Sequence, residues 1–196
     1  SVVGMVRAAE AGGTEALVRV TSSERTNILR ALDAGASGVL VPQVNSKEEA
    51  ERAGAAAHYP PDGVRGIAFS IRAARYGLRK PAEYLAAAKE ETLVCVQVES
   101  GRAVERVAEI ASVPLIDVLF VGPTDLSMNL GHPGDPTHPE VEEAIDRIFE
   151  AALASGKVPA ILANDVPTAE KWMAKGARML AANGTGILSK GMADLQ

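Results

Sequence analysis

The chain has 196 residues, a length that fits one domain with a sizeable core. Apolar residues make up 47% and charged residues 23%, the ordinary mix of a globular protein, which argues against a disordered chain. The net charge is −5 and the basic residues are scattered, so we expect neither a nucleic-acid partner nor an anionic membrane surface.

The compartment is predicted from three negative observations. Cys95 is the single cysteine, which rules out an intrachain disulfide, and its apolar surroundings favour a buried hydrophobe over a nucleophile. No run of about 18 apolar residues would form a transmembrane helix, and the first residues lack the layout of a signal peptide. We therefore expect a cytoplasmic protein.

Short apolar runs alternate along the chain with longer stretches of helical spacing, which predicts strands buried on both faces between helices. In chain order the predicted elements are a helix over Ser1–Ala11, a strand over Glu15–Val20, a helix over Ser22–Ala34, a strand over Gly38–Val44, a helix over Ser46–His58, an irregular stretch over Tyr59–Lys80, a helix over Pro81–Glu90, a strand over Thr92–Val98, a helix over Gly101–Ala111, a strand over Ile116–Val121, a helix over Pro139–Ser155, a strand over Val158–Ala163, a helix over Pro167–Lys175 and a strand over Arg178–Ala182.

This rhythm predicts βαβ units and a parallel sheet, an α/β fold in one domain over residues 1–196. A doubly wound nucleotide-binding sheet is disfavoured, because the sequence has neither a G-x-G-x-x-G nor a Walker A pattern. A (β/α)8 barrel needs about 250 residues. We therefore expect a (β/α)8 TIM barrel that lacks about its first two βα units, with a functional or interface role for the irregular stretch.

Two carboxylates follow neighbouring predicted strands. Glu99 ends the strand Thr92–Val98 and Asp125 follows the strand Ile116–Val121, and adjacent parallel strands lie about 4.8 Å apart. Both groups could reach one cation, and hard oxygen ligands favour Mg²⁺ or Mn²⁺. The alternative to a metal site is that Glu99 and Asp125 each cap the helix that follows. Gln97 shares the face of Glu99 and could bond to that ligand, or be an amide satisfied by backbone.

Other polar residues at the strand ends suit an anionic substrate. Arg19 lies in an apolar strand, so its guanidinium needs an anion, which could be a substrate, a developing enolate or a structural partner. The turn Gly122–Ser127 offers backbone N–H groups that suit a carboxylate. No lysine stands where an imine-forming group would have to lie, so chemistry on a carbonyl substrate would have to rely on metal. The histidines read as surface or loop residues, although His138 could reach the mouth of the site.

Five segments in this order resemble the HpcH/HpaI family of class II, metal-dependent pyruvate aldolases, which includes the 4-hydroxy-2-oxoheptanedioate and 2-dehydro-3-deoxyglucarate aldolases. The separation between VQVES and GPTDLS makes the resemblance specific. The segments are ALDAGASGVLVPQVNSKEEAE (residues 31–51), YPPDGVRGI (59–67), VQVES (96–100), VGPTDLSMNLG (121–131) and HPEVEEAI (138–145).

The resemblance implies a barrel of the phosphoenolpyruvate/pyruvate-domain type and reversible cleavage of a 4-hydroxy-2-oxo acid to pyruvate and an aldehyde, through a metal-stabilised pyruvate enolate. A divalent ion is implied, Mg²⁺ or Mn²⁺ and possibly Co²⁺, as is a homotrimer or homohexamer. By this resemblance Glu99 and Asp125 are the metal ligands and Arg19 stabilises the enolate. The expected substrate-binding residues are Gln97, Gly122, Pro123, Thr124, Asp125 and Leu162.

The sequence departs from the family pattern in three places. The family carries an Asp-x-Glu-His stretch, whose histidine takes part in proton transfer, before the point at which this chain begins. Thr185 and Ala160 stand where relatives often have aspartate and glycine. Two alternative functions are therefore considered: a CoA-ester carbon–carbon lyase of the citrate-lyase β type, against which the GPTDLS turn argues, and a non-catalytic barrel remnant.

Overall fold

The computed structural model describes residues 1–193 and 195 and contains one parallel six-stranded sheet. The strands follow one another across the sheet in chain order, β1-β2-β3-β4-β5-β6, so each is hydrogen-bonded to its sequence neighbours. Every pair is parallel, which confirms the predicted βαβ rhythm. The strands are β1 (Leu17–Arg19), β2 (Gly38–Val41), β3 (Leu93–Val98), β4 (Val118–Val121), β5 (Val158–Leu162) and β6 (Met179–Ala181).

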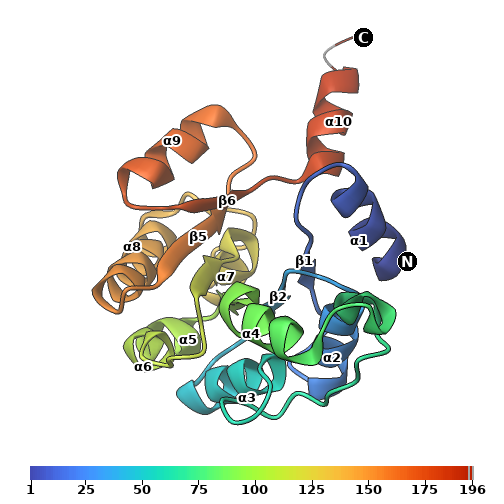
Figure 1. Cartoon of the computed structure of the whole chain (residues 1–196). Coiled ribbons are helices and arrows are strands. Elements are labelled where there is room, and N and C mark those ends of the chain that lie inside the picture. Colours follow the sequence, from blue (N-terminus) through green and yellow to red (C-terminus); the bar gives the residue numbers. More distant parts are fainter. Residues whose placement is uncertain (194, 196) are drawn as a thin grey trace.

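Helices cover the convex side of this curved sheet, as Figure 1 shows, and the whole is a partial barrel. Helix α10 projects away from the body. Within the described residues, none of the helices is long and apolar enough to cross a membrane. The helices are α1 (Val2–Ala11), α2 (Arg25–Asp33), α3 (Lys47–Ala57), the 3-10 helix η1 (Arg72–Gly77), α4 (Pro81–Glu91), α5 (Gly101–Glu105), α6 (Val107–Ala111), α7 (Pro123–Asn129), α8 (Pro139–Ala154), α9 (Val166–Ala174) and α10 (Gly184–Ala193).

The observed elements differ from the predicted ones mainly at their ends and at three short helices. The predicted helix over Gly101–Ala111 is two helices, because the backbone at Arg106 leaves helical geometry with φ −107° and ψ 13°. Helices η1 and α10 were not predicted, since they lie in a segment rich in glycine and proline or beyond the last strand. For α7 a short helix at Asp125 was expected, without bounds. The edge strands β1 and β6 are only partly buried, in contrast to the two-sided burial expected for every strand.

Side chains alternate along each strand between two apolar layers, because successive residues of a strand point to opposite faces. The outer layer packs against α2, α3, α6 and α8 and forms the main core. Its strand residues include Val39, Val41, Val94, Val96, Leu119, Val121 and Ile161.

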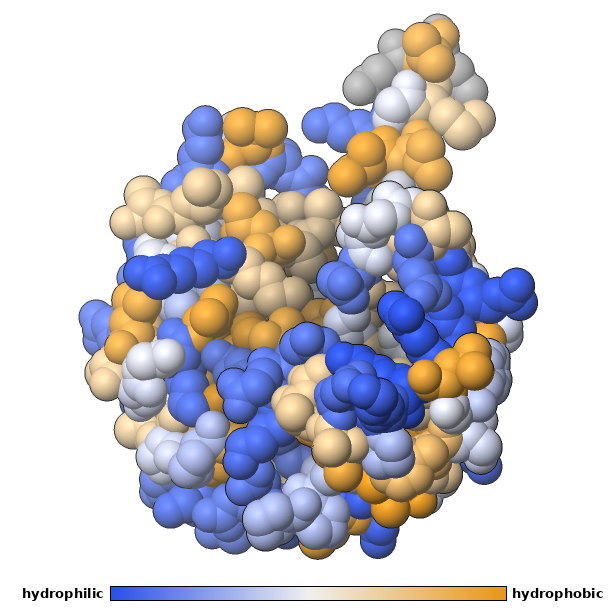
Figure 2. All heavy atoms as spheres, in the orientation of Figure 1, coloured by the Kyte–Doolittle hydropathy of each residue, from blue (hydrophilic) through white to orange (hydrophobic). Residues whose placement is uncertain are grey.

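The inner layer is smaller and is left partly open. Its buried members are Leu40, Cys95, Val118, Phe120 and Ala160, whereas inner residues of the flanking strands keep part of their surface exposed. Figure 2 shows this face hollowed, with hydrophobic side chains gathered in the opening. Burial raises the pKa of the Cys95 thiol to about 12. The side chain is fully buried, which confirms its prediction as a small core residue.

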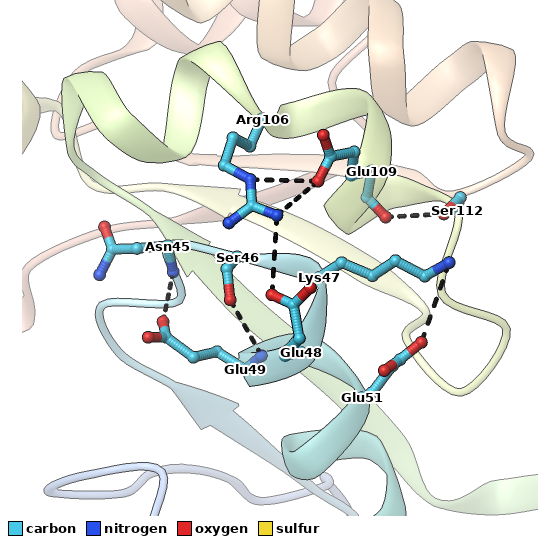
Figure 3. A network of polar contacts seen from close by, with 9 residues as sticks. All are labelled: Asn45, Ser46, Lys47, Glu48, Glu49, Glu51, Arg106, Glu109 and Ser112. Atoms are coloured by element: carbon cyan, nitrogen blue, oxygen red, sulfur yellow. Dashed lines mark hydrogen bonds and ion pairs between the residues drawn. The ribbon is translucent and has the colours of Figure 1, made fainter.

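Helix α3 begins directly after Ser46, the first residue of the predicted helix. The Ser46 hydroxyl accepts a hydrogen bond from the Glu49 N–H at 3.3 Å, and Figure 3 shows both residues beside the charged side chains of the same turn. The Glu49 carboxylate in turn accepts from the Asn45 N–H at 2.7 Å, one residue before the cap. Two N–H groups that the helix start would leave unpaired are thus satisfied, as in a capping box. This arrangement fixes the direction in which the chain leaves β2.

The irregular stretch Tyr59–Lys80 is anchored to the helices by a buried arginine. Arg65 is 4% exposed, donates to Asp33 at 3.0 Å and lies 4.5 Å from the centre of the Tyr59 ring. The Tyr59 and Tyr84 hydroxyls are 2.8 Å apart. Burial raises the pKa of Tyr59, so its phenol stays neutral. The first part of the stretch is therefore a packed structural element.

We expect Leu119→Ala to destabilise the protein strongly, because Leu119 is fully buried in the main core on a central strand. Truncating such a leucine costs about 2–5 kcal/mol, since the cavity does not close completely. Urea unfolding of both variants followed by far-UV circular dichroism measures the change. Leu78→Ala is the matched control, because Leu78 is 88% exposed and its truncation should change the free energy of unfolding by under about 0.5 kcal/mol. Equal effects in both variants would contradict this packing.

Candidate active site

The inner face of the sheet becomes polar at the carboxyl ends of its strands. Along β3 the inward positions run Leu93, Cys95 and Gln97, and Glu99 follows directly after the strand. Gln97 and Glu99 are 6% and 5% exposed, so an amide and a carboxylate are buried at the point where substrates bind in barrel enzymes. Buried polar groups of this kind need hydrogen-bond partners.

The Glu99 carboxylate is held on both oxygens. Oε1 accepts a hydrogen bond from the Gln43 backbone N–H at 3.0 Å, and Oε2 accepts from Gln97 Nε2 at 3.0 Å. Gln43 follows β2 in a left-handed conformation, with φ 55°. The predicted role of Gln97 as a partner of the acidic group is confirmed, and the partner on the other oxygen comes from the neighbouring strand's loop.

Arg19 reaches the same network from β1. Its Nε donates to Gln97 Oε1 at 2.7 Å, so the side chains of three residues form a continuous chain, Arg19 to Gln97 to Glu99. Among the described residues the hydrogen-bond partner of Arg19 is thus the neutral amide of Gln97, and the rest of its guanidinium is exposed on the edge strand β1.

Asp125 lies in the first turn of α7 and faces the same cleft as Glu99. Burial raises the pKa of Glu99, and the nearby Asp125 carboxylate raises it further, while the Gln43 N–H and Arg19 oppose the shift. The cleft has a volume of about 400 Å³ and is lined by Gln43, Asn45, Glu99, Ser100, Asp125, Met128 and Asn129. The structure therefore brings the two predicted acidic residues together, in a partly buried place where like charges repel.

The backbone of the turn between β4 and α7 lies close to the Glu99 carboxylate. A Cβ built on Gly122 would lie 2.6 Å from Glu99 Oε2 and 3.3 Å from Gln97 Nε2, so only glycine leaves room for the carboxylate. Pro123, Thr124 and Asp125 form the first turn of α7, and the N–H groups of Thr124 and Asp125 have no helical acceptor. Leu162 ends β5 and packs against the inner apolar layer.

Sequence reasoning missed five residues that line the cleft: Gln43, Asn45, Ser100, Met128 and Asn129. A left-handed residue is usually glycine or asparagine, so the sequence carries no signal for the conformation of Gln43. Ser100 caps α5, with its hydroxyl accepting from the Ala103 N–H at 3.1 Å, which a cap search could have found. The position of Asn45 follows only from the fold.

The histidines of the loop after α7 lie together, although sequence spacing did not predict a ligand set there. The His132 and His138 rings stack at 3.5 Å, and Glu140 completes a group that could hold a metal ion. His132 Nε2 already lies 2.7 Å from Glu140 Oε2, and His138 Nδ1 accepts the Glu140 N–H at 3.3 Å at the start of α8. His138 acts as a helix cap and does not line the cleft.

Two other hollows are larger, with volumes of about 460 and 630 Å³. Both are lined by Glu15, Gly35 and Ser37, before and at the amino ends of β1 and β2, and neither includes Glu99 or Asp125. We identify the smaller cleft as the candidate active site, because it alone combines the acidic pair with the carboxyl ends of the strands.

The donor set of this cleft suits a hard divalent cation. It offers two carboxylates without a histidine or cysteine among its lining residues, and oxygen ligands of this kind select Mg²⁺ or Mn²⁺. A bound cation would also relieve the repulsion between Glu99 and Asp125. The arrangement can thus hold a cation, with Gln97 and the Gln43 N–H orienting one of its ligands.

Comparison with known proteins gives consistent matches. The family model described as HpcH/HpaI aldolase/citrate lyase matches residues 1–189. The chain is 42% identical over 165 residues to a 5-keto-4-deoxy-D-glucarate aldolase of Shigella dysenteriae, covering 84% of this chain and 64% of that protein. It is also 42% identical over 172 residues to a hydroxypyruvate/pyruvate aldolase of Paraburkholderia phytofirmans, covering 86% of this chain and 65% of that protein.

The fold matches as well. A crystal structure of an HpcH/HpaI aldolase/citrate lyase family protein from Burkholderia cenocepacia superposes with a TM-score of 0.93 at 37% identity, covering 99% of this chain and 77% of that one. The curated relatives are longer than the region they share with this chain, which spans just under two thirds of their length.

We expect Gly122→Ala to weaken Mn²⁺ binding, because the added methyl group would displace the Glu99 carboxylate from its two donors. Disturbing the partners of a ligand typically costs about 10–100-fold in metal affinity. Titration of the apoprotein with Mn²⁺, followed by the electron paramagnetic resonance signal of the free ion, measures the affinity. Gly191→Ala in α10 is the control, since its Cβ would meet no atom within 4 Å. An unchanged affinity in Gly122→Ala would contradict the geometry.

Proposed function

Because the chain belongs to the HpcH/HpaI aldolase/citrate lyase family, we propose that it acts as a metal-dependent aldolase that reversibly cleaves a 4-hydroxy-2-oxo acid to pyruvate, or a related 2-oxo acid, and an aldehyde. The observation that carries the proposal is the pair Glu99 and Asp125 lining one cleft at the carboxyl ends of neighbouring strands. The names of the relatives at 42% identity, both aldolases, support the same reaction.

Glu99 and Asp125 are the proposed ligands of the cation, with Mg²⁺ or Mn²⁺ preferred and Co²⁺ possible. Both are oxygen donors, and the buried Glu99 is already oriented by a hydrogen bond on each oxygen. When bound, the cation supplies Lewis-acid stabilisation of the negative charge that develops on the 2-oxo acid. Burial and the neighbouring Asp125 raise the pKa of Glu99, and a cation bound beside it would favour its ionised form.

The chain's own residues would bind and orient the substrate. In cleavage the C4 hydroxyl gives its proton to a water molecule, the C3–C4 bond breaks to release the aldehyde, and the electron pair of that bond forms an enolate of the 2-oxo fragment. A proton from water then adds to C3 of the enolate and gives the 2-oxo acid. Arg19 uses Nε on Gln97, which leaves its Nη groups to donate to the enolate oxygen. The N–H groups of Thr124 and Asp125 would bind the substrate carboxylate, and Leu162 would line the aldehyde side.

The proposal extends to the assembly and to the remaining fold. We expect a complete (β/α)8 barrel, a homotrimer or homohexamer and a cytoplasmic location. Exposed apolar side chains on α10, which are Ile187, Leu188 and Met192, support burial against another subunit or segment. The alternative of a CoA-ester lyase of the citrate-lyase β type has weaker support, since it rests on the breadth of the family's description alone.

We expect the protein to release pyruvate from 4-hydroxy-2-oxo acids only with a divalent cation, and Glu99→Gln and Asp125→Asn each to abolish this release. Each substitution removes the negative charge of one proposed ligand while keeping the side chain's shape. Pyruvate is measured with lactate dehydrogenase, with and without EDTA. The controls Glu105→Gln and Asp146→Asn remove charges from the helical surface and should keep the activity. Full activity in both site variants would refute the ligand assignment.

Arg19→Ala should lower kcat by a factor of roughly 10², the usual loss when a donor to the developing charge is removed. Steady-state kinetics at saturating Mn²⁺ separates kcat from KM. Arg147→Ala removes an exposed arginine from α8 and should leave both constants unchanged. A rise in KM with an unchanged kcat would show that Arg19 contributes to substrate binding and not to the charge that develops in the reaction.

A further inference from the structure

The side-chain amide of Asn45 lines the candidate cleft, and both its nitrogen and its oxygen form hydrogen bonds within the protein. Its Nδ2 donates to the Gln43 carbonyl oxygen at 2.7 Å, and its Oδ1 accepts a hydrogen bond from the Ser100 hydroxyl. Its backbone N–H donates to Glu49, the contact drawn in Figure 3. Asn45 therefore links the loop after β2 to the segment after β3 that carries Glu99.

These contacts hold an unfavourable backbone conformation. Gln43 has φ 55°, a left-handed geometry that residues with a Cβ adopt at an energetic cost. The peptide group that follows Gln43 is held at both ends: its carbonyl accepts from Asn45 Nδ2, and its N–H, on Val44, donates to the Gln97 carbonyl at 3.1 Å. Without the Asn45 bond, only the Val44 N–H would keep this peptide in place.

The left-handed turn matters because the peptide after Gln43 is anchored to Asn45 and Gln97, so the backbone angles of Gln43 set the direction of the peptide before it. The N–H of that preceding peptide lies 3.0 Å from Glu99 Oε1. With the anchored peptide in place, an extended Gln43 would point this N–H away from Glu99. Glu99 Oε1 would then lose its backbone donor, and the neighbouring Asp125 would favour a different orientation of the Glu99 carboxylate. The Asn45 side chain thus acts on the orientation of Glu99 through the Gln43 backbone, without contacting Glu99.

We propose that Asn45 is a positioning residue, which holds the Gln43 backbone in the left-handed turn and so orients Glu99 for cation binding. The inference rests on the proposed role of Glu99 as a ligand. It goes beyond that role because it assigns the affinity of the site partly to a hydrogen bond between a side chain and a backbone carbonyl two residues earlier.

The test is Mn²⁺ titration of the apoprotein, followed by the electron paramagnetic resonance of free Mn²⁺, so that no turnover is needed. We expect Asn45→Ala to weaken binding by about tenfold or more, the range found for residues that orient a ligand. Asn27→Ala is the matched control, because the Asn27 amide likewise takes part in two side-chain hydrogen bonds but lies outside the cleft. Unchanged affinity in Asn45→Ala overturns the inference.

Two further variants separate positioning from other roles. Asn45→Asp keeps the shape and the acceptor for Ser100 but loses the donor to Gln43, so we expect weakened binding despite the added negative charge. Equal or tighter binding would mean that residue 45 acts as a direct ligand. Adding Gln43→Asn to Asn45→Ala should restore much of the affinity, because asparagine adopts the left-handed conformation more readily than glutamine. If the double variant binds Mn²⁺ no more tightly than Asn45→Ala, the inference that Asn45 acts through the Gln43 backbone is wrong.

Glu99→Gln in the same titration distinguishes failure of this inference from failure of the proposed function. If Glu99→Gln leaves the Mn²⁺ affinity unchanged, the proposed metal site itself is wrong. If Glu99→Gln weakens binding strongly while Asn45→Ala does not, the metal site stands and the role of Asn45 is wrong. Far-UV circular dichroism of each variant shows whether the fold is retained, and the Gln43→Asn restoration would not occur in an unfolded chain.

Discussion

The structure of the candidate site depends on one buried carboxylate. Glu99 is 5% exposed and lies beside a second acid, so its ionised form is stable only with donors aimed at it. One donor is a side chain two residues earlier on the same strand, and the other is a backbone N–H from the loop after the adjacent strand. The parallel pairing of β2 with β3 is what brings these groups together.

The two faces of these strands have different roles: one stabilises the fold and the other carries the candidate site. Their outward side chains form the large apolar core against the helices, whereas their inward side chains are apolar only up to the carboxyl ends. Polar groups appear on the inner face at Arg19, Gln97 and Glu99, where the apolar layer stops. The core can therefore hold the strand ends rigidly while the proposed cation and substrate reach the polar groups from the open end of the partial barrel.

The proposed chemistry follows from the order of contacts around Glu99. Arg19, Gln97 and Glu99 form one hydrogen-bonded chain. A change in charge on a bound 2-oxo acid would therefore affect both Arg19 and Glu99. Gly122 leaves room for the carboxylate, and Asn45 holds the turn that supplies the opposite donor. The proposed ligand is thus oriented from three strand ends, which suits a site that must present one fixed geometry to a cation.

Periodicity and residue type alone predicted all six strands, the parallel α/β architecture and the acidic pair Glu99 and Asp125, because these depend on local pattern and on the order of elements. Only the tertiary structure decided which groups satisfy Glu99. The hydrogen bonds from Gln43 to Glu99, from Ser100 to Asn45 and from Arg19 to Gln97 join residues 55 to 78 positions apart. No local signal encodes such contacts, since they form only when the strands align in the sheet.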